Sequence, residues 1–138
     1  MEEIKNAFAD VSDEVIDVTL PLPFLRDYYR DEAERVFWVN DEIDGFLLNL
    51  VKMIIRCNKE DKGKSVEERM PIRVFIDTPG GDICALWTTI KAIEISKTPV
   101  YTINYCTCYS AGADLLASGH KRFALPGTSA MVHSGSCV

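Results

Sequence analysis

Short apolar runs that alternate with helical segments constrain the fold of this chain more than any other feature. Strands are predicted at 35–39, 72–77, 100–104, 122–125 and 130–132, and helices in the stretches that follow the first three of them. Strands that alternate with helices favour parallel pairing through right-handed crossovers. We therefore predict an α/β fold with a parallel sheet.

Capping residues mark where the predicted helices begin. Asn40 and Asp41 offer an N-cap before a helical face of apolar residues, which comprises Ile43, Phe46, Leu47, Leu50, Val51, Ile54 and Ile55. Asp82 is the expected cap or first-turn acid of the second helix. The third helix is predicted at 110–118, where small residues follow a strand.

Two further features concern the core and the surface of this fold. Trp38 and Trp87 fall on apolar faces, so we expect both in the core. The segment 58–70 mixes lysines with acids and is expected to be a solvated loop without chemistry.

The 138 residues divide by charge and composition into an acidic N-terminal arm, 1–33, and one domain, 34–138. The net charge of −6 arises within residues 1–35, which carry ten acidic and four basic side chains, whereas residues 36–138 carry eleven of each. The prolines in Thr19–Pro23 disfavour a helix, so we expect the arm to be extended or a loop.

Composition also argues against two classes of partner. The chain has no basic stripe, so nucleic acid is not an expected partner. Its start lacks a signal-peptide pattern and no run approaches the roughly 20 apolar residues of a membrane span, so a membrane partner is not expected either.

The cysteines indicate a reducing compartment. There are five, an odd number scattered through apolar segments: Cys57, Cys84, Cys106, Cys108 and Cys137. Such usage predicts free thiols and a cytoplasmic protein. Cys106 and Cys108 with His120 and His133 would lack the second paired motif of a zinc site, so no metal is expected.

A serine at the junction of a strand and a small-residue helix is the strongest candidate for chemistry. Ser110, within Tyr109–Ala113, would place its hydroxyl on a tight turn beside helical N–H groups. His133 could act as general base, and the backbone N–H groups of Gly81 and Ala111 could hold an oxyanion. These are three of the four parts of an acyl-transfer site.

Each part also has a plainer interpretation. Ser110 could be only an N-cap, and His133 a hydrogen-bonded structural residue. Gly80-Gly81 could be a turn or a phosphate cradle, although the Lys-Ser/Thr of a P-loop is missing. His120 is interpreted as an exposed loop residue. The nearby acids need only capping or surface roles, so none is assigned as the orienting carboxylate: Asp77, Asp82 and Asp114.

Several motifs follow one another in a fixed order between Glu34 and Val138. They are Glu34-Arg35-Val36-Phe37 before Asn40-Asp41-Glu42, Ile76-Asp77-Thr78-Pro79-Gly80-Gly81, Ser110-Ala111-Gly112-Ala113-Asp114-Leu115-Leu116, Lys121-Arg122-Phe123-Ala124-Leu125-Pro126 and Met131-Val132-His133. In order and spacing these motifs resemble the proteolytic subunit of the Clp (caseinolytic) serine protease family.

The resemblance implies a serine endopeptidase of the Ser-His-Asp type that needs no cofactor. It puts Ser110 at the nucleophile position, His133 at the base position, and Gly81 and Ala111 at the oxyanion donors. The implied fold is the layered ββα superhelix that the Clp protease subunit shares with crotonases. The implied assembly is a homo-oligomeric ring, and a partner ATPase unfoldase would deliver unfolded polypeptides as substrates.

The chain also departs from the family pattern. Cys106, Cys108 and Tyr109 replace small residues before the nucleophile, Ala111 stands where methionine is common, and Ser134-Gly135 replaces Gln-Pro. These replacements indicate a divergent branch.

In the family the third triad member, an aspartate, follows the histidine, as does the helical segment that joins two rings. Neither is in this chain, which ends five residues past His133, so we expect the domain to be incomplete at its C-terminal end and the 138 residues alone to be nearly inactive. Two other functions stay open. They are a non-catalytic scaffold or assembly subunit, and a crotonase-like enzyme that holds an acyl-CoA thioester at two backbone amides.

Overall fold

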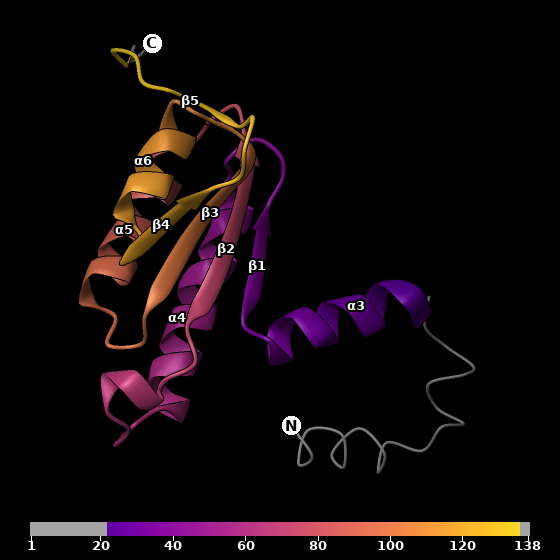
Figure 1. Ribbon diagram of the computed structural model, residues 1–138, viewed down its shortest axis with the longest axis vertical. Coiled ribbons are helices and arrows are strands. Elements are labelled where there is room, and N and C mark those ends of the chain that lie inside the picture. The colour runs from indigo at the N-terminus through magenta and orange to yellow at the C-terminus, as the bar shows by residue number, and fades with distance from the viewer. Residues whose placement is uncertain (1–21, 136–138) are drawn as a thin grey trace. The chain divides into compact units, whose positions relative to one another are not determined.

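The computed structural model describes residues 22–135. The chain divides into two units, Met1–Glu34 and Arg35–Val138, which are taken one at a time. In the first unit the described element is the helix α3, Leu22–Ala33 (Figure 1). The prediction of an extended arm or loop is therefore wrong for this stretch, and for residues 1–21 it lies outside the described residues.

The prolines mark the start of α3 instead of preventing a helix. Pro23 lies in the first turn, where a backbone N–H has no helical acceptor to lose. The residues that follow include good helix formers such as leucine, arginine, glutamate and alanine. Asp27 pairs with Arg30 at 3.0 Å across one turn of the helix. A proline signals a helix boundary, but it does not say on which side the helix lies.

The second unit is built on a sheet whose five strands within the described residues are β1 (Val36–Val39), β2 (Ile72–Thr78), β3 (Val100–Tyr109), β4 (Lys121–Ala124) and β5 (Ser129–Met131). The order is β1-β2-β3-β4, and β5 pairs with the carboxyl-terminal end of β3 (Figure 1). The helices between strands are α4 (Leu48–Glu60), α5 (Ile83–Ile95) and α6 (Ala111–Ser118). Every pairing is parallel, so the predicted α/β fold is confirmed.

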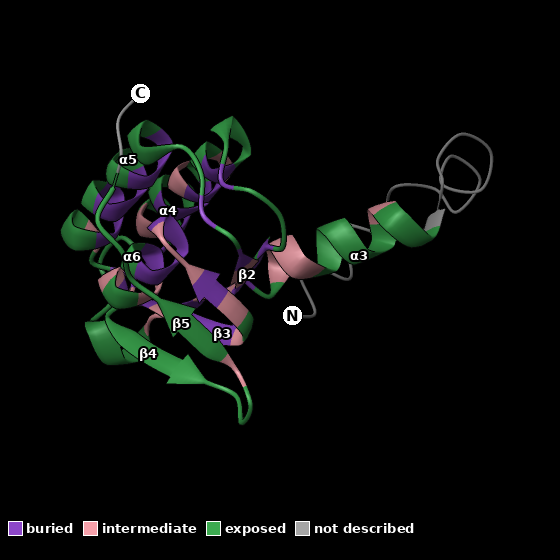
Figure 2. Cartoon of the chain, turned by 90° about the horizontal axis from the view of Figure 1, so that it is seen from above, coloured by how far each residue is buried: buried purple, intermediate pink, exposed green. Residues whose placement is uncertain are grey.

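The core lies between one face of the sheet and these helices. In β2 the buried side chains alternate with half-buried ones, as expected for a strand with one covered face. The largest fully buried apolar side chains come from both layers and include Leu50, Ile72, Ile76, Leu86, Ile93 and Leu115. Figure 2 shows this core in purple, with β4 and β5 exposed along their length.

Both tryptophans lie at the surface, which contradicts their predicted place in the core. Trp38 is 40% exposed on the sheet face opposite the core, where its ring stacks on Phe75 with centroids 4.6 Å apart. Trp87 is 54% exposed on the outer side of α5. Apolar periodicity identified the right elements, but it did not tell which side of each is covered.

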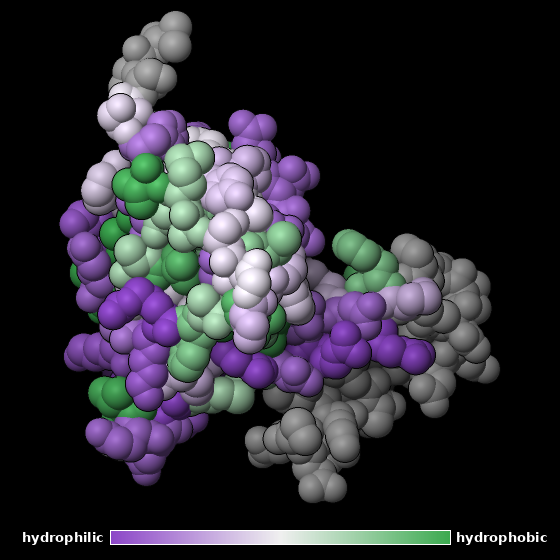
Figure 3. Space-filling model, turned by 45° about the horizontal axis from the view of Figure 1, so that its top comes forward, coloured by the Kyte–Doolittle hydropathy of each residue, from purple (hydrophilic) through white to green (hydrophobic). Residues whose placement is uncertain are grey.

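Further hydrophobic side chains are exposed on and after β4 and β5, namely Phe123, Leu125, Met131 and Val132. On the face of the molecule seen in Figure 3, hydrophobic side chains in green are interspersed with hydrophilic ones in purple. None of the helices between residues 22 and 135 is long and apolar enough to cross a bilayer.

The first core helix begins later than predicted. Residues 40–44 are not helical, and Ile43 forms a parallel bridge with Gly81. Asp44, not Asn40 or Asp41, caps a short 3₁₀ helix, Gly45–Leu47, that leads into α4. The predicted cap of α5 is confirmed, because Asp82 accepts hydrogen bonds from the amides of Cys84 and Ala85.

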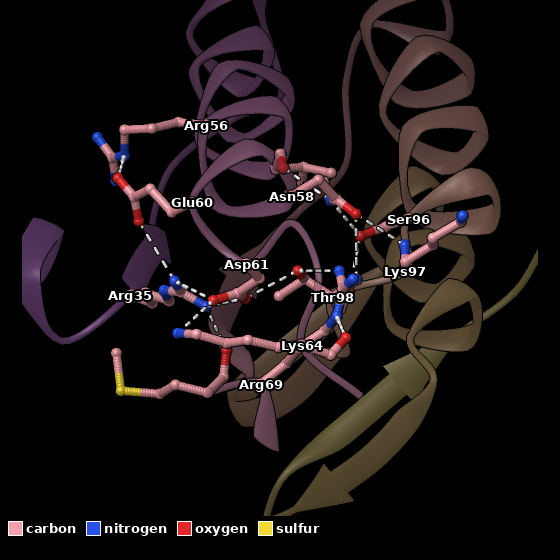
Figure 4. A network of polar contacts seen from close by, with 12 residues as sticks. Arg35, Arg56, Asn58, Glu60, Asp61, Lys64, Arg69, Ser96, Lys97 and Thr98 are labelled. Atoms are coloured by element: carbon pink, nitrogen blue, oxygen red, sulfur yellow. Dashed lines mark hydrogen bonds and ion pairs between the residues drawn. The ribbon is translucent and has the colours of Figure 1, made fainter. Parts of the chain in front are cut away.

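A buried ion pair fixes the amino-terminal ends of the strands (Figure 4). Arg35 precedes β1 with a positive φ of 55° and donates two hydrogen bonds, of 2.6 and 3.0 Å, to the fully buried carboxylate of Asp61. Thr98, just before β3, donates to the same carboxylate, and Arg35 also donates to the Met70 carbonyl just before β2. The segment 58–70 is mostly exposed, as predicted, but it is not a loop throughout, because α4 runs to Glu60 and Val66–Glu68 form a 3₁₀ helix. It also contains a structural anchor at the buried Asp61.

This anchor predicts a loss of stability in acid. Hydrogen bonding from Arg35 lowers the pKa of Asp61 to about 2 from its ordinary value of 3.8. Because the folded pKa is the lower one, the ionised carboxylate stabilises the fold at neutral pH, and about 2 kcal/mol is lost as pH falls from ~4 to ~2. Urea unfolding between pH 6 and 2 should show this extra acid loss in the wild type but not in Asp61→Asn. Parallel acid profiles for the two proteins would refute the assignment.

Candidate active site

Ser110 occupies a sharp turn between β3 and α6. Its φ of 53° and ψ of −122° are strained for a residue with a Cβ, and such strain costs on the order of 1–3 kcal/mol. A strained serine between a strand and a helix exposes its Oγ toward the helix N-terminus. Ser110 is the N-cap residue of α6, yet its side chain makes no capping hydrogen bond. The plain N-cap interpretation is therefore wrong, and the hydroxyl is available for another partner.

That partner is His133, whose Nε2 lies 2.8 Å from the Ser110 Oγ. The pairing of β5 with β3 brings the two together, because Tyr109 is in register with Met131. The Ser110 amide then donates a 2.8 Å hydrogen bond to the Met131 carbonyl, and His133 follows two residues later. The structure thus joins the two residues that sequence analysis named as nucleophile and base, from segments 23 residues apart.

The other histidine lies at the opposite end of β3. His120 is exposed, and its Nδ1 accepts a 2.9 Å hydrogen bond from the Val100 amide. This bond holds the turn before β4, so His120 has a structural contact in an exposed loop.

Two glycines after β2 lie close to other backbone segments, Gly80 to the Ser110 turn and Gly81 to Ile43. Gly80 has a φ of 110°, and a Cβ there would lie 2.9 Å from the Ser110 Cβ and 3.3 Å from the Ala111 nitrogen. Gly81 has a φ of 146°, and a Cβ there would lie 2.2 Å from the Ile43 carbonyl oxygen. Both positions therefore require glycine. The sequence predicts a turn or a phosphate cradle at Gly80 but not the contact with Ser110, although a pair of consecutive glycines is a signal for close backbone approach.

Backbone hydrogen bonds fix the residues on both sides of Gly81, whereas the Gly81 amide itself has no acceptor among the described residues. The Ile43 amide donates to the Gly80 carbonyl and the Asp82 amide donates to the Ile43 carbonyl, both at 2.7 Å. Within residues 22–135, neither the Gly81 amide nor the Ala111 amide has a hydrogen-bond acceptor. Ala111 is the first residue of α6, where amides point out of the helix and carry partial positive charge. Both predicted oxyanion donors are thus unoccupied N–H groups.

No carboxylate of the described residues hydrogen-bonds His133. Asp77 accepts from the amide and hydroxyl of Thr107, Asp82 caps α5, and Asp114 lies exposed in the first turn of α6. None of the three was assigned as orienter from the sequence, and the structure gives the first two other partners.

The cysteines near this end of β3 are poor nucleophiles. Burial raises the pKa of Cys108 to about 11, and the Asp77 carboxylate raises the pKa of the exposed Cys106 thiol. Both thiols are therefore protonated at neutral pH. Within the described part of the chain, no group of three or more His, Cys, Asp or Glu side chains could hold a metal ion, and Cys137 lies outside that part.

The matches to known proteins include the region that forms this site. Residues 33–138 match the model of the Clp protease family. The chain is 35% identical over 109 residues to the ATP-dependent Clp protease proteolytic subunit 3 of Synechococcus sp. (strain CC9605), covering 77% of this chain and 52% of the relative. It is 34% identical over 109 residues to proteolytic subunit 2 of Prochlorococcus marinus (strain MIT 9312), covering 77% and 51%. The chain spans about half the length of the curated relatives it matches.

Proposed function

The chain belongs to the Clp protease family, and on this premise we propose that it carries the nucleophile and base of a serine endopeptidase. The observation that carries the proposal is the 2.8 Å contact between the Ser110 Oγ and the His133 Nε2 at a strained turn. A serine and a histidine in hydrogen-bond contact are the minimal parts of nucleophilic acyl transfer.

The proposed mechanism gives a role to each part of the site. The Ser110 Oγ attacks the carbonyl carbon of a peptide bond while His133 Nε2 takes its proton. The amides of Gly81 and Ala111 donate hydrogen bonds to the oxyanion that forms. His133 then gives the proton to the leaving amine, and water, deprotonated by the same imidazole, hydrolyses the acyl-enzyme and restores the serine. No metal or organic cofactor takes part in these steps.

The proposal includes a carboxylate that orients His133. No described carboxylate contacts the imidazole, so we expect the aspartate of the triad to come from sequence beyond these residues. In the serine-protease template, loss of this carboxylate lowers turnover by about 10⁴. The 138 residues alone are therefore expected to react slowly.

Membership of the family supports a proposal for substrates, assembly and location. We propose that unfolded polypeptides are cleaved inside a homo-oligomeric ring in the cytoplasm. The relatives are named ATP-dependent, and we propose that a separate ATPase unfoldase delivers the substrate to this chain.

A fluorophosphonate probe tests the chemistry directly. It should form a covalent adduct with the full-length protein, and peptide mapping by mass spectrometry should place the adduct on Ser110. Binding of acyl-CoA without any adduct would support the crotonase-like alternative instead. An assembled ring that takes up neither reagent would support the non-catalytic scaffold.

The approach of Gly81 to Ile43 predicts a sensitive position. In Gly81→Ala the new methyl group would overlap the Ile43 carbonyl and displace the amide proposed to hold the oxyanion. We expect the rate of acylation by the probe to fall about 10²- to 10³-fold, as when one oxyanion donor is lost. Gly45→Ala is the matched control, because a Cβ at Gly45 meets nothing within 4 Å. Equal acylation rates in the two variants would remove Gly81 from the mechanism.

A further inference from the structure

Strand β3 changes its pairing partner along its length. Residues 101–104 pair with β4 and residues 107–109 pair with β5, on the same edge of β3 (Figure 1). Asn104 is the last residue in register with β4, so it lies where the chain passes from one strand to the next.

Asn104 contacts both strands at this change of partner. Its carbonyl accepts a 2.9 Å hydrogen bond from the amide of Leu125, the residue after β4. Its side-chain Nδ2 donates a 2.9 Å hydrogen bond to the carbonyl of Ser129, the first residue of β5. The turn between β4 and β5 is short, because the amide and the hydroxyl of Thr128 both donate hydrogen bonds to the Leu125 carbonyl. Asn104 therefore fixes the position at which β5 begins.

The start of β5 determines where His133 lies. From Ser129 the strand runs to Met131, whose carbonyl accepts from the Ser110 amide, and His133 follows two residues later. A shift of β5 by one residue would move the imidazole by about 3.3 Å and reverse the side on which each side chain points. The 2.8 Å contact between His133 and Ser110 cannot survive such a shift.

The side chain of Asn104 is a poor choice for the core on grounds of stability. Asn104 is 2% exposed, and within residues 22–135 its Oδ1 has no hydrogen-bond donor. A buried acceptor without a donor destabilises the fold, whereas a leucine of similar size would carry no polar atom. A buried polar residue whose side chain carries such a penalty is a candidate for a functional role.

We propose that Asn104 is a positioning residue, whose Nδ2 bond to Ser129 holds β5 in the register that places His133 against Ser110. This inference rests on the proposed peptidase function for its catalytic meaning. The register itself is independent of that function.

Asn104→Leu in the full-length protein tests the proposal with three measurements. We expect the unfolding midpoint to change little, because removal of the unpaired Oδ1 acceptor offsets the loss of the Nδ2 bond to Ser129. We expect the protection of the Ser110 amide against hydrogen exchange to fall, because its acceptor on Met131 is less firmly held. We expect acylation by a fluorophosphonate to slow at least tenfold per folded molecule.

Thr102→Val is the matched control on the same strand. It removes the hydrogen bond of another buried side chain, from the Thr102 hydroxyl to the Leu116 carbonyl, which does not involve β5. It should lower the unfolding midpoint and leave the acylation rate per folded molecule unchanged. If Asn104→Leu behaves in the same way, the role of Asn104 is only structural and the proposal is wrong.

The exchange measurement separates this proposal from the proposed function. If the wild type forms no adduct, the peptidase assignment fails, while amide protection still shows whether Asn104 holds β5. If Asn104→Leu is reactive and protected like the wild type, the positioning role fails and the peptidase stands. Should that variant not fold, Asn104→Asp serves as the second variant, because it keeps the shape of the asparagine side chain. Its ionised carboxylate cannot donate to the Ser129 carbonyl, so the protection factor of the Ser110 amide should fall as pH rises. Constant protection would refute the role.

Discussion

Replacing Ser110 by alanine should abolish covalent labelling and lower peptide turnover on the order of 10⁶-fold in the full-length protein. The effect is this large because no second hydroxyl contacts the His133 imidazole within the described residues. The fold should be unaffected, because alanine keeps the Cβ that Gly80 packs against. Labelling by a fluorophosphonate and hydrolysis of a short fluorogenic peptide measure the loss.

Ser118→Ala is the control for this variant. Ser118 ends α6, and its hydroxyl donates to the Leu115 carbonyl, away from the Ser110 turn. The Ser118→Ala variant should be labelled by the fluorophosphonate like the wild type. An adduct that persists in Ser110→Ala would mean that another side chain is the nucleophile.

The second large effect is expected at the buried ion pair. Asp61→Ala leaves the Arg35 guanidinium buried, and among residues 22–135 its remaining hydrogen-bond partners are the exposed Glu60 and the Met70 carbonyl. Removing one partner of a buried pair typically destabilises a protein by about 3–5 kcal/mol. Because a domain is stable by only about 5–15 kcal/mol, much of the protein should unfold in mild denaturant. Urea denaturation followed by circular dichroism measures the change.

Glu60→Gln provides the comparison. Glu60 contacts the same guanidinium at 3.2 Å from a side chain that is half exposed, so its loss should change stability by less than ~1 kcal/mol. Similar losses in the two variants would show that burial of Asp61 is not what makes the pair important.

The sequence allowed the sheet and the central contact of the site to be anticipated, because both depend on local patterns. Apolar runs followed by turns predicted parallel strands, and the parallel strands carried the residues at their carboxyl ends to one edge. Ser110 and His133 follow β3 and β5, which pair with each other, so their contact is a consequence of topology.

Other features depend on long-range contacts that no local pattern reports. The helix that begins at Leu48 was placed too early because Ile43 leaves the helical pattern to pair with Gly81. The strained conformation of Ser110 depends on the close approach of Gly80, and α6 can approach β2 only because Gly112 lies against Thr78. Whether a tryptophan on a strand is covered depends on which face the helices occupy.

The Arg35–Asp61 ion pair and the Ser110 turn lie at opposite ends of the same strands. Arg35, Met70 and Thr98 precede β1, β2 and β3, whereas Gly80 and Ser110 follow β2 and β3. The seven residues of β2 alone separate the two ends by roughly 20 Å, a distance at which mutational effects are usually additive. Substitutions around the ion pair could therefore raise the thermal stability of this fold without changing the reactivity of the serine at the opposite end of the strands.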